Sequence, residues 1–308
     1  MGRKYFLGID VGGTFTKAAL VNENGRLLVK QQISSKNFSD KAFFAHQIRS
    51  IFSSLVKIQK IRSSDVKAIG IGLPGPVDSK RGVVLSLTNI KKWDNFALVS
   101  YLKDFFSMPL FIENDANCMT LAESRLGAAR GASFALCLTL GTGVGAGLIL
   151  NNEIYRGPYF LGGEIGHIPM ALEGPRCECG GVACLERYVG NQALVRKLKT
   201  VFRRRISLEE ASVLAKNGDT RAIKIWRQAG EYIGLAVSSV VNTLNPEVIV
   251  IGGGVSLAGD VLWRSIRSTV KKHAMRFLKK RIKIKKAVCG NDAGVLGAAL
   301  LAKEKVTS

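Results

Sequence analysis

Residues 7–25 read LGIDVGGTFTKAALVNENG, and residues 136–154 read LCLTLGTGVGAGLILNNEI. When the two stretches are aligned, Gly12 falls on Gly141 and Asn22 falls on Asn151, 129 residues further along the chain. Each copy is an apolar run typical of a strand, then a glycine-rich turn, then a second apolar run. A unit that recurs in this way indicates an internal duplication. Because 308 residues also suggest two domains, the sequence predicts two related α/β halves.

The periodicity of apolar residues predicts the elements of each half. In the first half we expect strands over residues 5–9, 16–21, 27–33, 66–73 and 109–115, and helices over 38–60, 94–106 and 116–126. The apolar face of the helix over 38–60 consists of Phe44, Ile48, Ile51, Phe52 and Leu55. In the second half we expect helices over 186–201, 208–216, 221–244 and 293–305, and strands over 247–251 and 283–288.

The formal net charge of +22 raises the question of nucleic-acid binding. Much of this charge lies in residues 264–286, but Ile266, Val270, Ala274 and Phe277 recur there at helical spacing. This pattern favours an amphipathic helix whose basic face is solvated. A high net charge by itself is evidence about solubility and electrostatic steering, and it does not indicate a particular binding fold. We therefore expect no specific nucleic-acid partner.

The sequence shows neither a secretion signal nor a membrane span. Asp10 interrupts the first apolar run too early for a signal peptide. The longest apolar stretch, residues 232–244, is too short to cross a bilayer. We therefore expect a cytoplasmic protein with no membrane partner, in which cysteines serve as metal ligands or buried thiols rather than as disulfides.

Three glycine-rich turns each follow a strand-like run: DVGGT at residues 10–14, LGTGVGAG at 140–147 and GGGV at 252–255. Glycine allows backbone N–H groups to approach a ligand closely, and such turns form anion-binding concavities. Phosphate binding is one interpretation, and tight structural hairpins are the other. The sequence GxxxxGK[ST] is absent, and the dinucleotide fingerprint at 141–146 is followed by a strand-like run instead of a helix.

Taken together, DVGGT with Lys17, GIGLPGPVD, ENDAN, LGTGVGAG, GGEIGH and CECGGVACLE resemble the ROK sugar kinases, in the same order and over nearly the whole chain. The resemblance implies two RNase H-like domains of the actin and hexokinase type around a cleft. We expect a small domain over residues 1–115, completed by a C-terminal helix over 292–308, and a large domain over 116–291. The family also contains sugar-responsive repressors, which carry a DNA-binding module before the first glycine turn. Because DVGGT begins at residue 10 here, we expect a kinase and not a repressor.

The segment 164–186 contains three of the six cysteines. Together His167, Cys177, Cys179 and Cys184 have the number and type of ligands of a closed tetrahedral zinc site, and the ROK pattern places zinc on these four positions. The alternative is three free thiols in a loop. One departure from the family is Ala183, where glycine is usual. The cysteines outside this cluster, Cys118, Cys137 and Cys289, are expected in the core.

The resemblance also assigns the residues of a phosphoryl-transfer site. Asp115 would be the catalytic base for the sugar hydroxyl, although an aspartate at this position could equally be a helix N-cap. The residues expected to contact the sugar are Gly75, Asn114, Asp115, Glu164, His167 and Glu186. Asp10 would bind Mg²⁺. The residues expected to bind the phosphates are Gly12, Gly13, Thr14, Lys17, Thr142 and Gly143, and Gly253 and Gly254 would approach the adenosine.

The activity implied is that of an ATP-dependent kinase acting on the 6-hydroxyl of a hexose, with glucose as the expected substrate. An N-acetylhexosamine kinase and a non-catalytic sugar-binding regulator are the alternatives, and polyphosphate remains open as a donor. The expected cofactors are ATP, Mg²⁺ and a structural Zn²⁺. Family resemblance alone suggests a homodimer or homotetramer.

Overall fold

A computed structural model describes residues 4–87 and 90–307 of the chain. By their contacts these residues form two compact units. Of the described residues, the first contains 4–87, 90–126, 156–162 and 291–307, and the second contains 127–155 and 163–290. Residues 1–3, 88–89 and 308 of the expected first domain lie outside the described residues. Within the described residues, no helix is both long and apolar enough to span a membrane.

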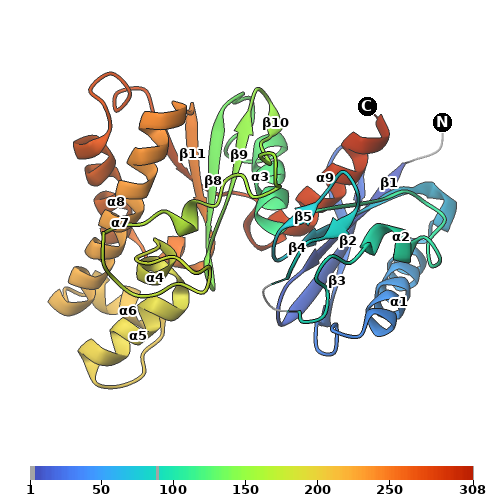
Figure 1. The fold of residues 1–308 in the computed structure, drawn as a ribbon, viewed down its shortest axis with the longest axis horizontal. Helices are drawn as coiled ribbons and strands as arrows, with labels where there is room; N and C mark the ends of the chain where they lie inside the picture. Colours follow the sequence, from blue (N-terminus) through green and yellow to red (C-terminus); the bar gives the residue numbers. More distant parts are fainter. Residues whose placement is uncertain (1–3, 88–89, 308) are drawn as a thin grey trace. The chain divides into compact units, whose positions relative to one another are not determined.

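The first unit is built on a five-stranded sheet with the order β3-β2-β1-β4-β7 (Figure 1). Its strands are β1 (Tyr5–Val11), β2 (Phe15–Asn22), β3 (Leu27–Ser34), β4 (Val66–Leu73) and β7 (Leu110–Asn114). The first three strands are antiparallel neighbours, whereas β4 and β7 run parallel to β1. The carboxyl ends of β1, β4 and β7 therefore lie at one edge, which is a common location for sites in α/β folds.

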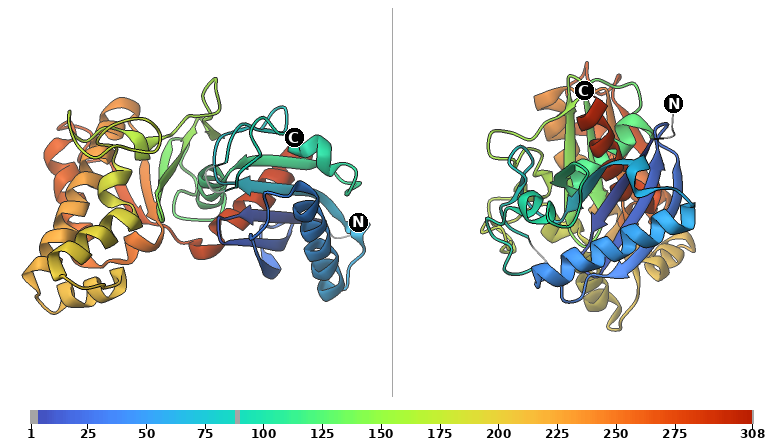
Figure 2. Two further views of the ribbon diagram at one scale, coloured as in Figure 1. Left: turned by 60° about the horizontal axis from the view of Figure 1, so that its bottom comes forward. Right: turned by 90° about the vertical axis from the view of Figure 1, so that its right-hand side faces the viewer.

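Helices cover both faces of this sheet. Figure 2 shows α1 (Lys41–Gln59) running across one face, where its predicted apolar residues are all buried. The helix α9 (Ala293–Thr307) packs on the other face, together with α3 (Asp115–Arg125). The approach of α9 is so close that a Cβ at Gly70 would overlap the carbonyl oxygen of Ala298. The expected domain boundary after residue 115 cuts α3 after its first residue, but α3 packs against α9, and the whole helix belongs to the first unit.

The second unit repeats this topology. Its sheet has the order β10-β9-β8-β11-β12, formed by β8 (Ala135–Leu140), β9 (Val144–Leu150), β10 (Glu153–Ile154), β11 (Val248–Gly252) and β12 (Lys283–Lys286). Antiparallel pairing joins β8, β9 and β10, and parallel pairing joins β8, β11 and β12. The order and directions match those of the first sheet strand for strand, which confirms the predicted duplication.

The helices of the second unit form one large core with this sheet. They are α4 (Glu186–Val189), α5 (Asn191–Phe202), α6 (Leu208–Lys216), α7 (Thr220–Leu244) and α8 (Asp260–His273). The last two pack closely, because Gly230 and Gly234 of α7 leave room for the Ser265 and Thr269 side chains of α8. Trp226 and Trp263 are buried at the centre of this core.

Four sequence expectations were wrong in detail. The helix expected over 94–106 shrinks to α2 (Leu98–Leu102), because Asn95 adopts a positive φ of 51° in the preceding turn. The helix expected over 186–201 is interrupted at Gly190, which separates α4 from α5. The basic helix ends at His273, so Phe277 is 78% exposed rather than part of the apolar face. Cys289 is partly exposed, whereas Cys118 and Cys137 are buried as expected.

Candidate functional site

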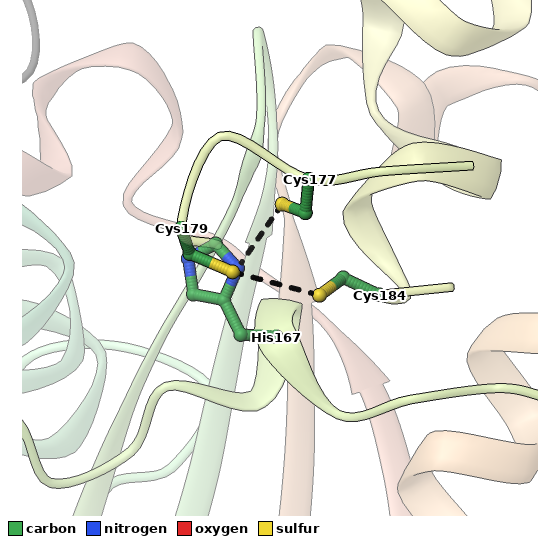
Figure 3. A group of neighbouring side chains, drawn as sticks. All are labelled: His167, Cys177, Cys179 and Cys184. Carbon is green, nitrogen blue, oxygen red and sulfur yellow. Dashed lines mark hydrogen bonds between the residues drawn. The ribbon is translucent and has the colours of Figure 1, made fainter. Parts of the chain in front are cut away.

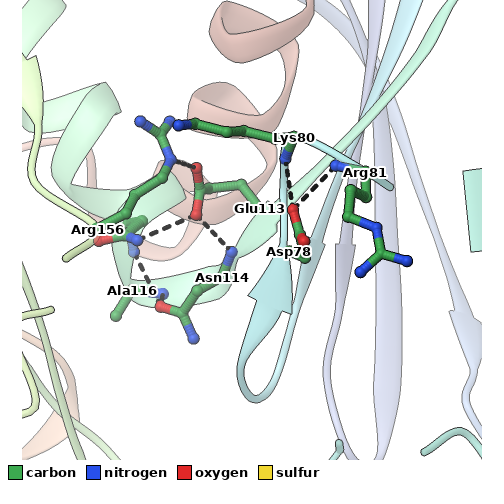
Figure 4. A network of polar contacts seen from close by, with 8 residues as sticks. Asp78, Lys80, Arg81, Glu113, Asn114, Ala116 and Arg156 are labelled. Carbon is green, nitrogen blue, oxygen red and sulfur yellow. Dashed lines mark hydrogen bonds and ion pairs between the residues drawn. The ribbon is translucent and has the colours of Figure 1, made fainter. Parts of the chain in front are cut away.

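The expected base lies where β7 ends and α3 begins. Asn114 is the N-cap of α3, since its Oδ1 accepts the N–H groups of Ala116 at 2.9 Å and Asn117 at 3.2 Å (Figure 4). Its Nδ2 donates to the Gly75 carbonyl at 3.2 Å, which brings together two of the predicted sugar-contact positions. Asp115 is the first residue of the helix, and its Oδ1 also accepts the Ala116 N–H, at 2.8 Å. The capping role is thus filled by Asn114.

A buried carboxylate directly before this pair was not identified from the sequence. Glu113 is 3% exposed, and its Oε1 accepts the Asn114 N–H and the Asn117 Nδ2, both at 3.0 Å. Its Oε2 pairs with Arg156 Nε at 2.6 Å. The one available signal was a glutamate directly after the apolar run PLFI, a position where a charge needs a partner. Nothing in the local sequence indicates that the partner is Arg156.

Asp10 lies near the carboxyl end of β1, against the first turn of α9. A Cβ at Gly294 would lie only 2.5 Å from Asp10 Oδ2, so the helix backbone approaches the carboxylate directly. Burial raises the pKa of Asp10, and the nearby Lys17 partly offsets this effect. A carboxylate that is costly to ionise in the free protein fits a site for a hard cation, which favours oxygen ligands.

The first glycine turn closes the β1–β2 hairpin, since the Gly12 N–H donates to the Phe15 carbonyl at 3.1 Å. Gly13 and Thr14 are exposed at its tip. Lys17, expected to contact a phosphate, donates from Nζ to the Asn291 carbonyl at 2.7 Å. In this arrangement Lys17 secures the turn that leads into α9.

The second glycine turn is held by a predicted sugar residue. The Val144 N–H donates to Glu186 Oε2 at 2.8 Å, and the Asn191 N–H donates to the Gly141 carbonyl at 3.0 Å. A Cβ at Gly143 would overlap Glu186 Oε2, so the carboxylate packs directly against the backbone of this turn. The expected phosphate residues Thr142 and Gly143 therefore lie in direct contact with the segment that begins at Glu186.

A single turn of 3₁₀ helix, η2 (Ile165–His167), carries both residues: Glu164 is at its N-cap position and His167 is its last residue. His167 Nε2 lies 3.8 Å from Glu164 Oε2. Burial raises the pKa of Glu164; His167 acts against this shift and Glu186 adds to it. These three predicted sugar residues thus form one polar group within the second unit.

The predicted metal ligands converge (Figure 3). The ligand atoms of His167, Cys177, Cys179 and Cys184 all lie within 4.8 Å of one another. His167 Nδ1 is 3.6 Å from Cys177 Sγ, and Cys179 Sγ is 3.7 Å from Cys184 Sγ. In tetrahedral coordination, Zn–S and Zn–N bonds of about 2.3 and 2.1 Å place sulfur atoms ~3.8 Å apart and sulfur and nitrogen ~3.6 Å apart. The four residues therefore fit a structural zinc ion.

The third glycine turn follows β11. Gly253 has a φ of 82°, and a Cβ there would overlap the backbone of Leu140. Gly254 begins the short helix η3 (Gly254–Leu257) and is exposed. The two residues expected near adenosine thus lie beside the end of β8. The other predicted residues divide by unit: the base, Asp10 and the first turn belong to the first unit, and the second turn, Glu164, Glu186 and the metal ligands belong to the second.

Two α/β units of one topology, each with a glycine-rich turn after its first strand, define the actin/hexokinase-like class of two-domain proteins. Within that class the chain belongs to the ROK family, whose sequence profile matches residues 6–305. It is 32% identical to the glucokinase of Halalkalibacterium halodurans, a match that covers all of this chain and 98% of that protein. The xylose repressor of Bacillus subtilis is 28% identical, over 95% of this chain and 75% of that protein.

Solved structures show the same relationship. The ROK hexokinase from Thermus thermophilus superposes with a TM-score of 0.86 at 34% identity, covering 98% of this chain and 99% of that one. A ROK family glucokinase from Streptomyces griseus, in complex with glucose and AMPPNP, gives a TM-score of 0.83 at 29% identity, with coverage of 97% and 99%. A putative N-acetylmannosamine kinase from Listeria monocytogenes gives a TM-score of 0.85 at 26% identity, covering 99% of this chain and 100% of that one.

Proposed function

We propose that the protein is an ATP-dependent hexose kinase that transfers the γ-phosphate to the 6-hydroxyl, with glucose as the substrate. The observation that carries this proposal is the placement of Asp115 in the first turn of α3, with Asn114 serving as the cap. The positive end of a helix stabilises a carboxylate in its ionised form, which is the form that a base requires.

The proposed reaction needs few covalent contributions from the protein, because phosphoryl transfer depends mainly on positioning and charge stabilisation. Asp115 accepts the proton of the 6-hydroxyl while that oxygen forms a bond to the γ-phosphorus. The bond between the γ-phosphorus and the bridging oxygen breaks, and ADP leaves with that oxygen. Asp10 would hold Mg²⁺, which neutralises negative charge on the phosphates when it is bound.

Glu164, His167 and Glu186 supply the acceptors and donors that a ring of sugar hydroxyls needs. The geometry of His167 supports a double role, because Nδ1 faces the cysteine cluster and Nε2 faces Glu164. A zinc ion on the first nitrogen would fix the ring and thereby orient the second nitrogen toward the sugar. The metal cluster would then act as a rigid support for sugar recognition.

The choice of glucose rests on the relatives. A glucokinase-named relative covers the chain from end to end, and a related structure holds glucose together with AMPPNP. The putative N-acetylmannosamine kinase is the observation that favours an N-acetylhexosamine as the alternative substrate. The xylose repressor favours a sugar-binding regulator, against which the Asp115 and Asp10 placements argue.

The test is an ADP-release assay over a panel that includes glucose, mannose, N-acetylglucosamine and N-acetylmannosamine, with ATP and again with polyphosphate as the donor. We expect the highest kcat/KM for glucose with ATP. Asp115→Asn should lower kcat by about 10²-fold or more while sugar affinity stays within a few-fold. Full turnover in Asp115→Asn would refute its assignment as the base, and turnover of no sugar by the wild type would refute the kinase proposal.

A further inference from the structure

We infer that Arg156 is a positioning residue for the reaction: through Glu113 it fixes Asn114 and the first turn of α3, and thereby the Asp115 carboxylate. This inference rests on the proposed function, because it takes Asp115 as the base. Arg156 itself has no place in the sequence motifs that define the expected site, and it is 43 residues away from Glu113 in the chain.

The Glu113 carboxylate is the centre of the arrangement (Figure 4). Its side chain is only 4% exposed, and the Arg156 side chain is 25% exposed. One oxygen, Oε2, receives the guanidinium at 2.6 Å. The other, Oε1, receives both the Asn114 N–H and the Asn117 Nδ2 at 3.0 Å. The Glu113 carboxylate thus connects Arg156 to Asn114 and Asn117, which lie on either side of Asp115 and Ala116 in the sequence.

Loss of the guanidinium would disturb this arrangement because a buried, unpaired charge is costly. The carboxylate would then turn toward solvent, which weakens the bonds that Oε1 accepts. Asn114 would lose a restraint on its backbone just where its side chain caps α3 and reaches the Gly75 carbonyl. A displacement of about 1 Å at a reacting group can cost roughly 10²-fold in rate.

The surroundings strengthen the need for a cation at this point. The pKa of the buried Cys118 thiol, one turn into α3, is raised by burial and then by Glu113, Asp10 and Asp115, whereas Arg156 acts in the opposite direction. The negative charges of three carboxylates therefore act on the start of α3, and the positive charge of Arg156 partly compensates for them. The segment 156–162 belongs to the first unit, although residues 127–155 and 163–290 on either side of it belong to the second.

The chain offers a matched control at the far end of the same helix. Arg125, the last residue of α3, pairs with Glu304 of α9 at the same distance, Nε to Oε1 2.6 Å. Both pairs anchor α3 within the first unit, but only the Arg156 pair touches the residues next to Asp115. Because Glu304 is 40% exposed and Glu113 only 4%, the two variants can differ in stability, and the comparison rests on kcat. A role in stability alone leaves kcat unchanged in both variants, whereas a positioning role lowers it only when Arg156 is replaced.

The experiment compares Arg156→Ala, Arg156→Lys and Arg125→Ala with the wild type, using ATP and the best sugar of the panel. We expect Arg156→Ala to lower kcat by about 10- to 100-fold with both KM values within about threefold. Arg156→Lys should recover part of the loss, and guanidinium ion should restore activity to Arg156→Ala but not to Asp115→Asn. Arg125→Ala should lower the melting temperature and leave kcat within about twofold.

A wild-type kcat in Arg156→Ala, or equal losses of kcat in the two alanine variants, would overturn the inference. If Arg156→Ala does not fold, Arg156→Lys and Arg125→Lys decide by the same criteria. Hydrogen exchange separates this inference from the proposed function, because the measurement needs no turnover. The backbone N–H groups of Asn114 and Asn117 should exchange faster in the Arg156 variants than in the Arg125 variants. Unchanged exchange there would contradict positioning by Arg156. If exchange is faster but Asp115→Asn retains full activity, the assignment of the base is refuted, and with it the effect of Arg156 on the reaction through Asp115.

Discussion

Glu186 Oε2 accepts the backbone N–H of Val144 at 2.8 Å, so a residue expected to contact the sugar also closes the glycine turn expected to hold phosphate. The two residues are 42 positions apart. A Cβ at Gly166 would overlap the Val144 carbonyl, which shows that the turn bearing His167 packs on the same residue from its other side. The glycine turn, the polar group of Glu164, His167 and Glu186, and the predicted metal ligands thus lie together in the second unit.

This contact predicts that Glu186 affects the nucleotide as well as the sugar. Glu186→Ala removes the charged acceptor of the Val144 N–H, a bond of a kind that contributes about 1.5–3 kcal/mol. We expect the KM for ATP to rise about tenfold or more, together with the KM for sugar, whereas Glu186→Gln should lose less because its amide oxygen can still accept. Glu173→Gln, at an exposed position, is the control. A KM for ATP that stays constant in Glu186→Ala would show that the turn does not depend on this bond.

The metal cluster is tested by removing one ligand. Cys179→Ser should reduce zinc content well below one ion per chain, because a hydroxyl is a poor zinc ligand compared with a thiolate. We expect a lower melting temperature and a raised KM for sugar, with a smaller change in the KM for ATP, because the Glu186–Val144 bond does not involve Cys179. Elemental analysis and steady-state kinetics provide the measurement. Cys289→Ser, outside the cluster, should leave zinc content unchanged, and a metal-free wild type with full activity would refute the site.

Ala183 is expected to carry backbone strain beside the metal ligands. Its φ is +56°, in the left-handed region, where a Cβ costs about 1–2 kcal/mol relative to glycine. Ala183→Gly should therefore stabilise the zinc-loaded protein by about 1 kcal/mol, measured by denaturant unfolding. Ala211→Gly, at a buried position within α6, should instead destabilise the protein by about 1 kcal/mol. A loss of stability in Ala183→Gly would mean that packing of the methyl group outweighs the strain.

We expect the Asp10 carboxylate to lower the stability of the folded protein while being required for activity. Because burial raises its pKa in the folded state, the ionised carboxylate is destabilising, and this penalty develops as the pH rises through the folded pKa. Asp10→Asn should therefore be more stable than the metal-free wild type at pH 8, and this advantage should vanish well below the raised pKa. Its kcat should fall steeply. Thermal unfolding at several pH values, with the exposed Asp94→Asn as control, makes the comparison. A less stable Asp10→Asn at pH 8 would contradict the prediction.

The basic segment is expected to bind polyanions only weakly. Residues 264–286 contain eleven Lys and Arg and no Asp or Glu. Such a surface should bind duplex DNA through its phosphates, with an affinity that falls steeply as salt is added. Fluorescence anisotropy with two unrelated duplexes at several salt concentrations measures this. Tight binding that depends on sequence at physiological salt would instead indicate a regulatory role.

The sequence by itself determined the features that depend on local pattern. Strand and helix positions follow from apolar periodicity, and the duplication is visible because Gly12 and Gly141 punctuate the same strand–turn–strand unit. The Cys/His cluster was also recognisable as a candidate metal site, since its three cysteines lie within eight residues of one another in a short loop. Helix periodicity was misleading where a turn residue interrupted the expected helix, as Asn95 and Gly190 do.

Only the tertiary structure decided which polar groups become partners. The pairs Glu113–Arg156 and Val144–Glu186 join residues about forty positions apart, and Lys17–Asn291 joins residues 274 positions apart. No local pattern specifies such pairs, because they arise from how strands are ordered in a sheet and where the connecting segments return. The motif residues could be identified from the chain, whereas the bonds that orient them depend on burial: Glu113 needs Arg156 because the fold removes its carboxylate from water.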